Sequence, residues 1–356
     1  MEKQGKRFFI FAVGRKGGCT EYAYNVISNF SANSYDLYLS KFYKKKVNLN
    51  NVCRIYTYKS IFAFFINSIF YFPFILIGIF YNIIRKKYSS VYFPYFHHWN
   101  IFILLLFKIF GKKTIVTVHD GILHSGDGFP FDQLLSNLII RLADKVIFLT
   151  VHVQNITKNN LNFNIESKII PHGIINLEGI KGEIRIQKPT PKILFIGRIN
   201  KYKGVENLIK AISMLNIDIY DKLTIVGKVS YSIERPDSNK IEIIDKWVDD
   251  SEFAYYINSN DILVLPYLEA TQSGVVSVGI DGCIPMVCTR VGGLIEQLEE
   301  NEEAIFTDTN PESLKQGIIQ LIRDKSLYEK ISCNLYKKKG NLTWKNISKE
   351  IQEYIL

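Results

Sequence analysis

The stretch "LPYLEATQSGVVSVGIDGCIPMVCTRVGG" (residues 265–293) decides the fold. An apolar run stops at Pro266, a short polar segment leads to Gly274, and helix-like sequence follows before a second apolar run. This order predicts a strand, a turn, a helix and a second strand, which is the repeating unit of a parallel α/β sheet. The turn residues Gln272, Ser273 and Gly274 then lie where a strand ends and a helix begins. An ordinary capped helix explains them equally well at this stage.

The same alternation of short apolar runs and helical stretches continues along the chain. Uninterrupted apolar runs are typical of buried parallel strands, so we expect two parallel sheets. The polar, Gly- and Pro-containing segment 176–191 is the predicted linker. The predicted domains are residues 1–180 and 181–340, with residues 341–356 as a final helix that packs back on the first domain. The predicted strands are 7–13, 90–95, 114–118, 145–149, 168–170, 192–197, 222–227, 261–266 and 285–289.

The composition favours an anionic partner. The chain has 356 residues, a formal net charge of +10 and a pI near 9.1, although an AT-rich codon bias would also enrich Lys. Five cysteines without a C-x-x-C pair suggest neither a disulfide framework nor a zinc site. The basic start precedes too short an apolar stretch for a signal peptide, so we expect a cytoplasmic protein.

Residues 61–84 are almost entirely apolar and are followed by Arg85, Lys86 and Lys87. Their length would span a bilayer, whereas Asn67 and Pro73 within the segment argue against a simple span. Three interpretations stay open: a spanning helix, a helix pair on a membrane surface, and a core helix pair. The second interpretation, together with the basic net charge, predicts peripheral contact with an anionic membrane.

Open parallel sheets bind ligands beyond the carboxyl ends of their strands, and these ends carry the candidate site residues. A guanidinium can bind two oxygens, a lysine adds a second fixed cation, and a helix start offers free amides, which together suit a diphosphate. Ordinary solvated basic residues are the alternative. The residues concerned are Gly17 and Gly18 in the loop 14–18, His119, Arg198, Lys203, Gln272, Ser273 and Gly274.

His119, Asp120 and His124 form a polar cluster after the strand 114–118. A histidine suits hydrogen bonding or proton transfer, although a lone histidine after a strand is often structural. The sequence has no G-x-G-x-x-G, Walker, H-E-x-x-H, G-x-S-x-G or D-x-D motif. We therefore expect a metal-free site without cofactors that neutralises phosphate with basic side chains and amides.

At these residues the sequence resembles the GT-B glycosyltransferases, specifically the retaining family 4. The similarity runs from the loop 14–18 to "LTWKNI" (342–347), and is strongest in "FIGRINKYKGVENLIKAI" (195–212), 265–296 and "TIVTVHD" (114–120). It implies two Rossmann-like domains facing a central cleft. It further implies that Arg198 and Lys203 bind the donor diphosphate, that Gly17 and Gly18 lie beside phosphate and acceptor, and that His119 contacts the transferred sugar.

One departure concerns the two glutamates of the family motif. Their positions fall on Ala270 and Val278, and Glu269 is displaced by one residue. The stretch instead resembles an A-T-Q-S-G variant, in which backbone amides from Gln272 to Val275 would face the phosphates. The departure leaves ribose and sugar recognition open, including whether Glu269 substitutes.

The resemblance implies retaining transfer of a sugar from a nucleoside diphosphate sugar to a glycan or lipid-linked acceptor. We expect this at the inner face of the cytoplasmic membrane, in bacterial surface polysaccharide synthesis. A non-catalytic sugar-nucleotide-binding or partner subunit is the main alternative, because both acidic positions are missing. Nucleic-acid binding fits poorly, since the basic residues do not cluster with aromatic residues in a recognised module.

Overall fold

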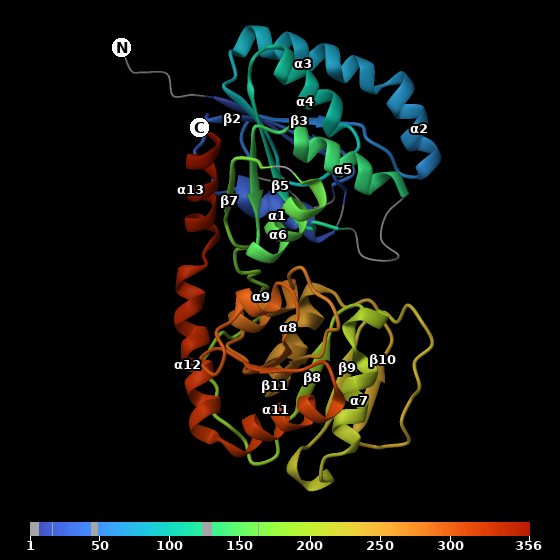
Figure 1. Cartoon of the computed structure of the whole chain (residues 1–356), viewed down its shortest axis with the longest axis vertical. Coiled ribbons are helices and arrows are strands. Elements are labelled where there is room, and N and C mark those ends of the chain that lie inside the picture. The colour runs from blue at the N-terminus through green and yellow to red at the C-terminus, as the bar shows by residue number, and fades with distance from the viewer. Residues whose placement is uncertain (1–6, 16, 44–48, 123–129, 163) are drawn as a thin grey trace. The chain divides into compact units, whose positions relative to one another are not determined.

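The computed structural model describes residues 7–15, 17–43, 49–122, 130–162 and 164–356. The chain forms two compact units (Figure 1). Unit 1 comprises Met1–His172 and Trp344–Leu356, and unit 2 comprises Gly173–Thr343. Each unit is described by itself.

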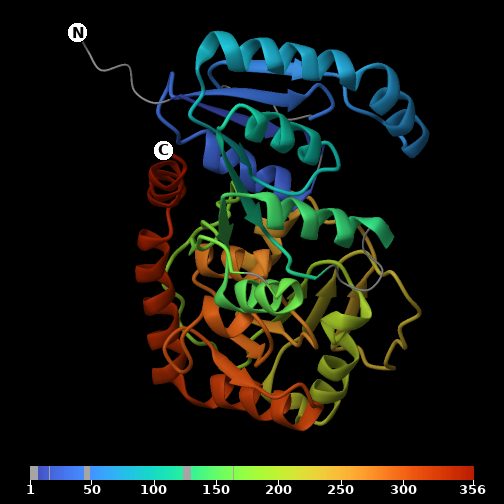
Figure 2. The ribbon, with the colours of Figure 1, turned by 45° about the horizontal axis from the view of Figure 1, so that its top comes forward.

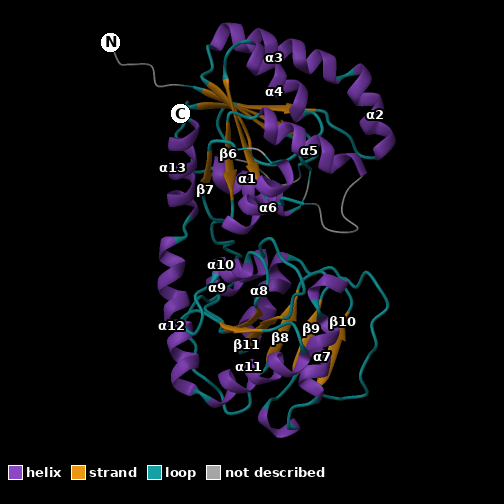
Figure 3. Cartoon of the chain, in the orientation of Figure 1, coloured by secondary structure: helices purple, strands orange, loops and turns teal. Residues whose placement is uncertain are grey.

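The described residues of unit 1 form a seven-stranded, wholly parallel sheet in the order β3-β2-β1-β4-β5-β6-β7. Its strands are drawn in orange in the upper part of Figure 3. The first six strands follow the order of a dinucleotide-binding Rossmann fold, whose direction of winding reverses between β1 and β4. The strands are β1 (Phe8–Ala12), β2 (Tyr35–Ser40), β3 (Val52–Ile55), β4 (Ser90–Phe93), β5 (Lys113–Val118), β6 (Lys145–Phe148) and β7 (Ser167–Ile169).

Two hydrophobic clusters cover the two faces of this sheet. Buried residues of α3, α4, α5 and α6 form one cluster, and those of α1 and α13 form the other. Helix α13 therefore belongs to unit 1 although it ends the chain, and Trp344 packs edge-to-face on Tyr22. The bounds are α1 (Gly18–Ile27), α2 (Ile61–Phe70), α3 (Phe72–Lys86), α4 (Asn100–Ile109), α5 (Pro130–Leu142), α6 (Val151–Leu161) and α13 (Trp344–Ile355).

The apolar segment 61–84 forms two helices that meet at 51° around Tyr71. Helix α3 lies along the outside of unit 1 and α2 continues it at an angle (Figure 2). Helix α3 buries one stripe that includes Ile75 and Ile79, whereas α2 buries no residue at all. A plain core helix pair is therefore not what the structure shows. Within the described residues no one helix has the length and apolarity to cross a membrane, and this bent pair would meet both criteria only when its two helices are taken together.

Unit 2 contains a six-stranded parallel sheet in the order β10-β9-β8-β11-β12-β13. This is again the Rossmann order, with the reversal between β8 and β11. The strands are β8 (Ile193–Ile196), β9 (Leu223–Val226), β10 (Ile241–Ile244), β11 (Ile262–Leu265), β12 (Met286–Thr289) and β13 (Ile305–Thr307). The helices are α7 (Val205–Ser213), α8 (Asp250–Ser259), α9 (Gly274–Asp281), α10 (Leu294–Gln297), α11 (Pro311–Arg323) and α12 (Lys325–Asn341).

The predicted linker 176–191 has neither helix nor strand and is fastened to unit 2. The Arg185 guanidinium donates hydrogen bonds to the carbonyls of Ile257, Asn260 and Gly282, at 2.6–2.8 Å. This guanidinium therefore caps the C-terminal ends of α8 and α9. The division between the units follows His172, eight residues before the predicted boundary after residue 180.

All nine predicted strands are present, and the described residues hold four further strands that were not predicted: β2, β3, β10 and β13. Edge strands β3 and β10 are half-exposed, so their sequences lack the continuous apolar run used for the prediction. Strand β2 is buried, but it includes Asp36, whose carboxylate pairs with Arg7 at 2.8 Å. Because Arg7 lies 29 residues before Asp36, the local sequence pattern could not predict this pairing.

Candidate functional site

The strongest cluster of predicted residues lies at the reversal point of the unit 2 sheet. Strands β8 and β11 are neighbours there, and both end at the same edge because they are parallel. Arg198 follows β8, and the segment 266–274 follows β11. Ligands of open parallel sheets bind at this place, since the connections leave the sheet in opposite directions and open a crevice.

Two glycine turns pack tightly at this edge. Gly197 follows β8 with φ +132°, and Gly227 follows β9 with φ +155°, both in the region that favours glycine. A Cβ on Gly227 would lie 1.8 Å from the Gly197 carbonyl oxygen. Bare backbone at both positions is therefore needed to bring the two strand ends together beside Arg198.

A short 3₁₀ turn, Lys201–Lys203, positions the second predicted cation. Gly204 ends this turn with φ +63°, and a Cβ there would lie 2.0 Å from the Pro266 carbonyl oxygen. The Leu268 amide donates to the Tyr202 carbonyl at 2.7 Å. These contacts hold the turn against the segment after β11.

Lys203 is connected to the helix start at 273–274 through Tyr267. The Lys203 Nζ lies 3.5 Å from the centroid of the Tyr267 ring, and the Tyr267 hydroxyl lies 3.2 Å from Ser273 Oγ. The start of α9 also approaches β8, because a Cβ on Gly197 would lie 3.6 Å from Val275 Cγ2. The structure thus gathers the predicted residues of unit 2 around one strand edge.

The two cations differ in their surroundings. Burial, and next the positive charge of Arg198, lower the pKa of Lys203 from 10.5 to about 7. Arg198 is exposed and has no hydrogen bond or ion pair with any described residue. A guanidinium left without a partner beside a lysine with a lowered pKa is an arrangement that an anion would stabilise.

The amides of the turn are only partly available. The Ser273 amide donates to Gln297 Oε1 at 2.8 Å, and Gln297 Nε2 donates back to the Ser273 carbonyl at 3.2 Å. Ser273 therefore fixes the turn, while Gly274 and Val275 begin α9, where a helix leaves its N–H groups without intrahelical acceptors. Gly274 is exposed and Gln272 half-exposed. Gln297 lies 24 residues after Ser273, and the sequence did not indicate that the two residues pair.

The positions of the family glutamates are apolar and enclosed. Ala270 is 7% and Val278 3% exposed, so neither has room or solvent for a carboxylate. Glu269 is exposed. Unit 2 thus has no acidic side chain at either position, and both positions are buried.

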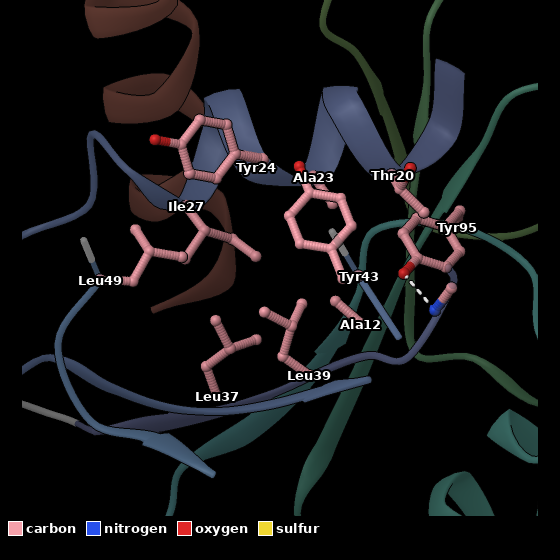
Figure 4. Close-up of a pocket in the computed structure, with 11 residues that line it drawn as sticks. Ala12, Thr20, Ala23, Tyr24, Ile27, Leu37, Leu39, Tyr43, Leu49 and Tyr95 are labelled. Carbon is pink, nitrogen blue, oxygen red and sulfur yellow. Dashed lines mark hydrogen bonds between the residues drawn. The ribbon is translucent and has the colours of Figure 1, made fainter. Parts of the chain in front are cut away.

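In unit 1 the glycine loop likewise lies at a reversal point, between β1 and β4. The Gly14 amide donates to the Tyr95 hydroxyl at 2.7 Å, as Figure 4 shows, and a Cβ on Gly14 would lie 2.6 Å from Thr20 Cγ2. Gly17 has φ +102°, and a Cβ on Gly17 or Gly18 would meet nothing within 4 Å. The loop is therefore packed at Gly14 and open at Gly17 and Gly18.

The space in Figure 4 lies behind this loop and is lined mainly by apolar side chains, among them Ala12, Leu37 and Leu39. Its volume is about 10 Å³, which is roughly the space of one water molecule. A larger cavity of about 210 Å³ lies at the end of β5 and is lined by His119, Asp120, Asp132 and Cys19.

His119 is buried, and Nε2 of its ring lies 3.0 Å from the Pro94 carbonyl oxygen. Burial lowers the pKa of His119, but the neighbouring Cys19 and the Pro94 carbonyl outweigh it and raise the pKa to about 9. Cys19 was not predicted as a site residue; its place directly after Gly18 was the available signal. His124, from the predicted polar cluster, and Lys16, from the loop, lie outside the described residues.

Residues 190–324 match the family model of glycosyl transferases group 1. The chain is 28% identical over 250 residues to an uncharacterized glycosyltransferase of Methanocaldococcus jannaschii, covering 63% of this chain and 60% of that protein. It is 25% identical over 272 residues to an uncharacterized 41.2 kDa protein in the cps region of Klebsiella pneumoniae, covering 75% of this chain and 69% of that protein. The chain thus spans about 60% of the length of the first of these curated relatives.

Among solved structures, the Anabaena protein HepE in complex with UDP matches with a TM-score of 0.71 at 12% identity. The match covers 98% of this chain and 99% of HepE. With two Rossmann-like parallel-sheet domains and GT-B glycosyltransferases as structural neighbours, the predicted α/β fold class is confirmed. The matched family model lies wholly within unit 2, the unit that holds Arg198 and Lys203.

Proposed function

We propose that this chain is a glycosyltransferase that binds a nucleoside diphosphate sugar at the β8–β11 edge of unit 2. The observation that carries the proposal is the linkage of Lys203 through Tyr267 to Ser273. Arg198 lies beside Lys203 and has no partner among the residues that the structure describes. Two cations and the first amides of α9 match the charge and hydrogen-bonding needs of a diphosphate. The match of residues 190–324 to the group 1 family supports the assignment, as does the UDP bound to HepE.

The reaction we propose is transfer of the sugar to an acceptor hydroxyl with retention of anomeric configuration and without a metal. The bond between the sugar and the diphosphate breaks, and Arg198, Lys203 and the helix amides stabilise the charge on the departing diphosphate. The acceptor would be bound by unit 1, at the loop containing Gly17 and Gly18 and near His119. Nε2 of His119 already donates to the Pro94 carbonyl, so Nδ1 is the ring nitrogen that would contact the sugar.

We further propose a glycan or lipid-linked acceptor at the inner face of the cytoplasmic membrane, in bacterial surface polysaccharide synthesis. The relative from the cps region of Klebsiella pneumoniae supports this setting. Helix α2 supports contact with anionic lipid, because large apolar side chains such as Phe62, at 74% exposed, cover it. Exposed basic residues flank the pair of helices, Lys59 before α2 and Arg85 and Lys87 at the end of α3. Apolar insertion with basic flanks is the pattern of interfacial helices.

The absence of both family glutamates favours one alternative, a non-catalytic sugar-nucleotide-binding or partner subunit. A two-stage experiment separates the two functions. Thermal unfolding with a panel of nucleoside diphosphate sugars identifies a donor, since a ligand of the folded state raises the melting temperature. The stabilising donor is then incubated with membrane lipid extract, with and without EDTA, and sugar transfer and hydrolysis are measured.

Transfer that survives EDTA, with the product anomer matching the donor, supports the full proposal. Binding without transfer or hydrolysis would support the non-catalytic alternative. No stabilisation by any member of the panel would contradict both.

A further inference from the structure

The buried Ser277 joins the start of α9 to the segment in which the chain enters unit 2. Its hydroxyl accepts a hydrogen bond from the Ile175 amide at 2.7 Å and donates one to the Gly173 carbonyl at 3.2 Å. Gly173 is the first residue of unit 2, and Ser277 lies 102 residues after Ile175. One hydroxyl of α9 therefore satisfies both a donor and an acceptor of the entering segment 173–175.

The same side of α9 carries the glycine of the candidate donor turn. Gly274 and Ser277 lie three residues apart in one helix, so they share a face. A Cβ on Gly274 would lie 3.3 Å from Ile175 Cδ1. The segment 173–175 thus packs against the first turn of α9 at two points, with its backbone at Ser277 and with a side chain at Gly274.

The entering segment is also bonded to the place where the chain leaves unit 2. The Ile174 amide donates to the Leu342 carbonyl at 3.0 Å. Within unit 1, the rings of His172 and Trp344, the residues at which the chain leaves and re-enters this unit, have centroids 5.0 Å apart. The two chain crossings are therefore held together by a backbone hydrogen bond in unit 2 and by a ring contact in unit 1.

Both of these rings pack on Tyr22, which also packs on the candidate site histidine. The Tyr22 ring centroid lies 5.5 Å from that of His172, 5.8 Å from that of Trp344 and 4.7 Å from that of His119. Tyr22 is 1% exposed, so its ring is enclosed by close-packed neighbours. The order of the two crossings therefore affects the surroundings of His119 through one aromatic side chain.

An anion at the start of α9 stabilises the first turn of this helix. The first four N–H groups of a helix have no intrahelical acceptor, so the first turn opens more easily than the middle. A diphosphate supplies both acceptors and negative charge at this place. Ser277 is the fourth residue of α9, so opening of this turn releases the segment 173–175 as well. An anion that prevents the opening orders both.

We propose that Ser277 is a positioning residue through which diphosphate binding at the start of α9 orders the two chain crossings and the rings around His119. The inference rests on the donor site proposed above. Ser277 acts through the segment that it holds, whereas other residues bind the diphosphate. Because coupling between two binding sites is reciprocal, the unit 1 site should bind its acceptor more tightly when a donor occupies unit 2.

Ser332 provides a matched control within unit 2. Its hydroxyl accepts from the Arg185 amide at 2.8 Å and donates to the Cys283 carbonyl at 2.8 Å, the same pattern as at Ser277. Ser332 is also buried, but it lies on α12 and does not contact the segment 173–175 through these bonds. An alanine at either position leaves one backbone donor and one acceptor without this partner, so both variants should lose similar stability.

The test is hydrogen exchange of the full chain, measured by mass spectrometry, with inorganic pyrophosphate as the probe. At ten times the dissociation constant of pyrophosphate, openings that disrupt its site should become about tenfold rarer. Exchange in the wild type should therefore slow at residues 173–175 and at the start of α13 (344–350), and not at 273–277 alone.

Ser277→Ala should bind pyrophosphate within about threefold of the wild type, because the diphosphate contacts remain, but it should lose the slowing at 344–350. Ser277→Thr keeps the hydroxyl and should retain the slowing. Ser332→Ala should retain it as well, which separates the coupling from a general loss of stability.

Two results would overturn the proposal. One is slowing confined to residues 273–277 in the wild type, which decides the matter whether or not Ser277→Ala folds. The other is slowing at 344–350 that persists in Ser277→Ala. If pyrophosphate does not bind at all, the proposed donor site fails and this inference fails with it. Binding without slowing at 344–350 overturns the inference alone.

Discussion

The Lys203 ammonium nitrogen lies 3.5 Å from the centroid of the Tyr267 ring, and the hydroxyl of that ring lies 3.2 Å from Ser273 Oγ. One aromatic side chain therefore connects a cation after β8 with the start of α9. The ring attracts the ammonium by a cation–π interaction, which is stronger away from water. Tyr267 is itself buried, so it holds Lys203 in place rather than merely touching it.

Two substitutions at Tyr267 separate the ring from its hydroxyl. Tyr267→Phe should lower the free energy of unfolding by about 1 kcal/mol, since it leaves the buried Ser273 hydroxyl without this partner. Donor affinity should hold within about threefold, because the ring under Lys203 remains. Tyr267→Leu should weaken donor binding by about tenfold or more. Calorimetric titration and chemical denaturation measure both effects, and equal donor affinities for the two variants would contradict a positioning role of the ring.

The lowered pKa of Lys203 predicts a pH dependence of donor binding. Lys203 is charged below about pH 7. A bound diphosphate would raise this pKa, because a nearby negative charge favours the protonated ammonium. Donor affinity should therefore fall as pH rises above 7, by at most about tenfold per pH unit. The protein should also take up protons when the donor binds. A nucleoside diphosphate sugar is the suitable probe, because its diphosphate does not titrate near neutral pH. Lys203→Arg should flatten the profile, and an unchanged profile in that variant would assign the dependence to another group.

The same pKa shift predicts how stability varies with pH without ligand. Unfolded Lys203 binds a proton up to about pH 10.5 and the folded residue only up to about 7, so stability should rise between these values. Below pH 7 the cost of burying the charge is fully present. Lys203→Met should therefore stabilise the protein at pH 6 while abolishing donor binding. Melting temperatures at pH 6 and 9 provide the check, and a variant that is less stable at pH 6 would contradict the shift.

Arg198→Ala should weaken donor binding without harming the fold. The side chain is exposed and unpaired among the described residues, so its loss should change the melting temperature little. A charge-assisted hydrogen bond contributes about 1.5–3 kcal/mol, which predicts a loss of about 10- to 100-fold in donor affinity and a strong fall in turnover. Arg323→Ala, at the exposed end of α11, is the matched control for net charge. Near-normal turnover in Arg198→Ala would rule out the assigned role.

Helix α2 should determine membrane binding. None of its residues is buried, so Phe62→Asp combined with Phe65→Asp should leave the fold intact. Each buried phenylalanine contributes about 1.5–3 kcal/mol, and the double variant should lose more than about 100-fold in partitioning to anionic liposomes. Trp247→Asp, an exposed aromatic residue of unit 2, is the control. Flotation with liposomes gives the result, and wild-type protein that stays with the soluble fraction would exclude lipid as the partner.

The missing glutamates predict opposite outcomes at two positions. Val278→Glu should destabilise unit 2 by roughly 3 kcal/mol or more, since it buries a carboxylate without a partner. Glu269→Gln should leave stability unchanged, because Glu269 is exposed. If Glu269 replaces a family glutamate, Glu269→Gln should also weaken binding of the donor sugar relative to free nucleoside diphosphate. Equal effects on the two ligands would show that Glu269 does not recognise the sugar.

The sequence alone was sufficient for the fold class and for placing the unit 2 candidates at one edge of their sheet. Strands such as 192–197 and 261–266 are buried on both faces and therefore appear as continuous apolar runs. Residues that follow such strands are placed at one sheet edge by the parallel arrangement itself, which is why Arg198 and Gly274 could be predicted together. Half-exposed edge strands and the pairing of Asp36 with Arg7 have no such local pattern.

Only the tertiary structure decided how these residues are held. The contact of Lys203 with Tyr267 and the pairing of Ser273 with Gln297 each join segments that lie far apart in the chain. Local sequence specifies backbone periodicity and turn chemistry, whereas a side chain's partner, burial and pKa depend on which elements pack against it. For this protein the sequence placed its cations and glycines at strand ends, and packing determined which of them are paired, which are exposed and which carry a proton at neutral pH.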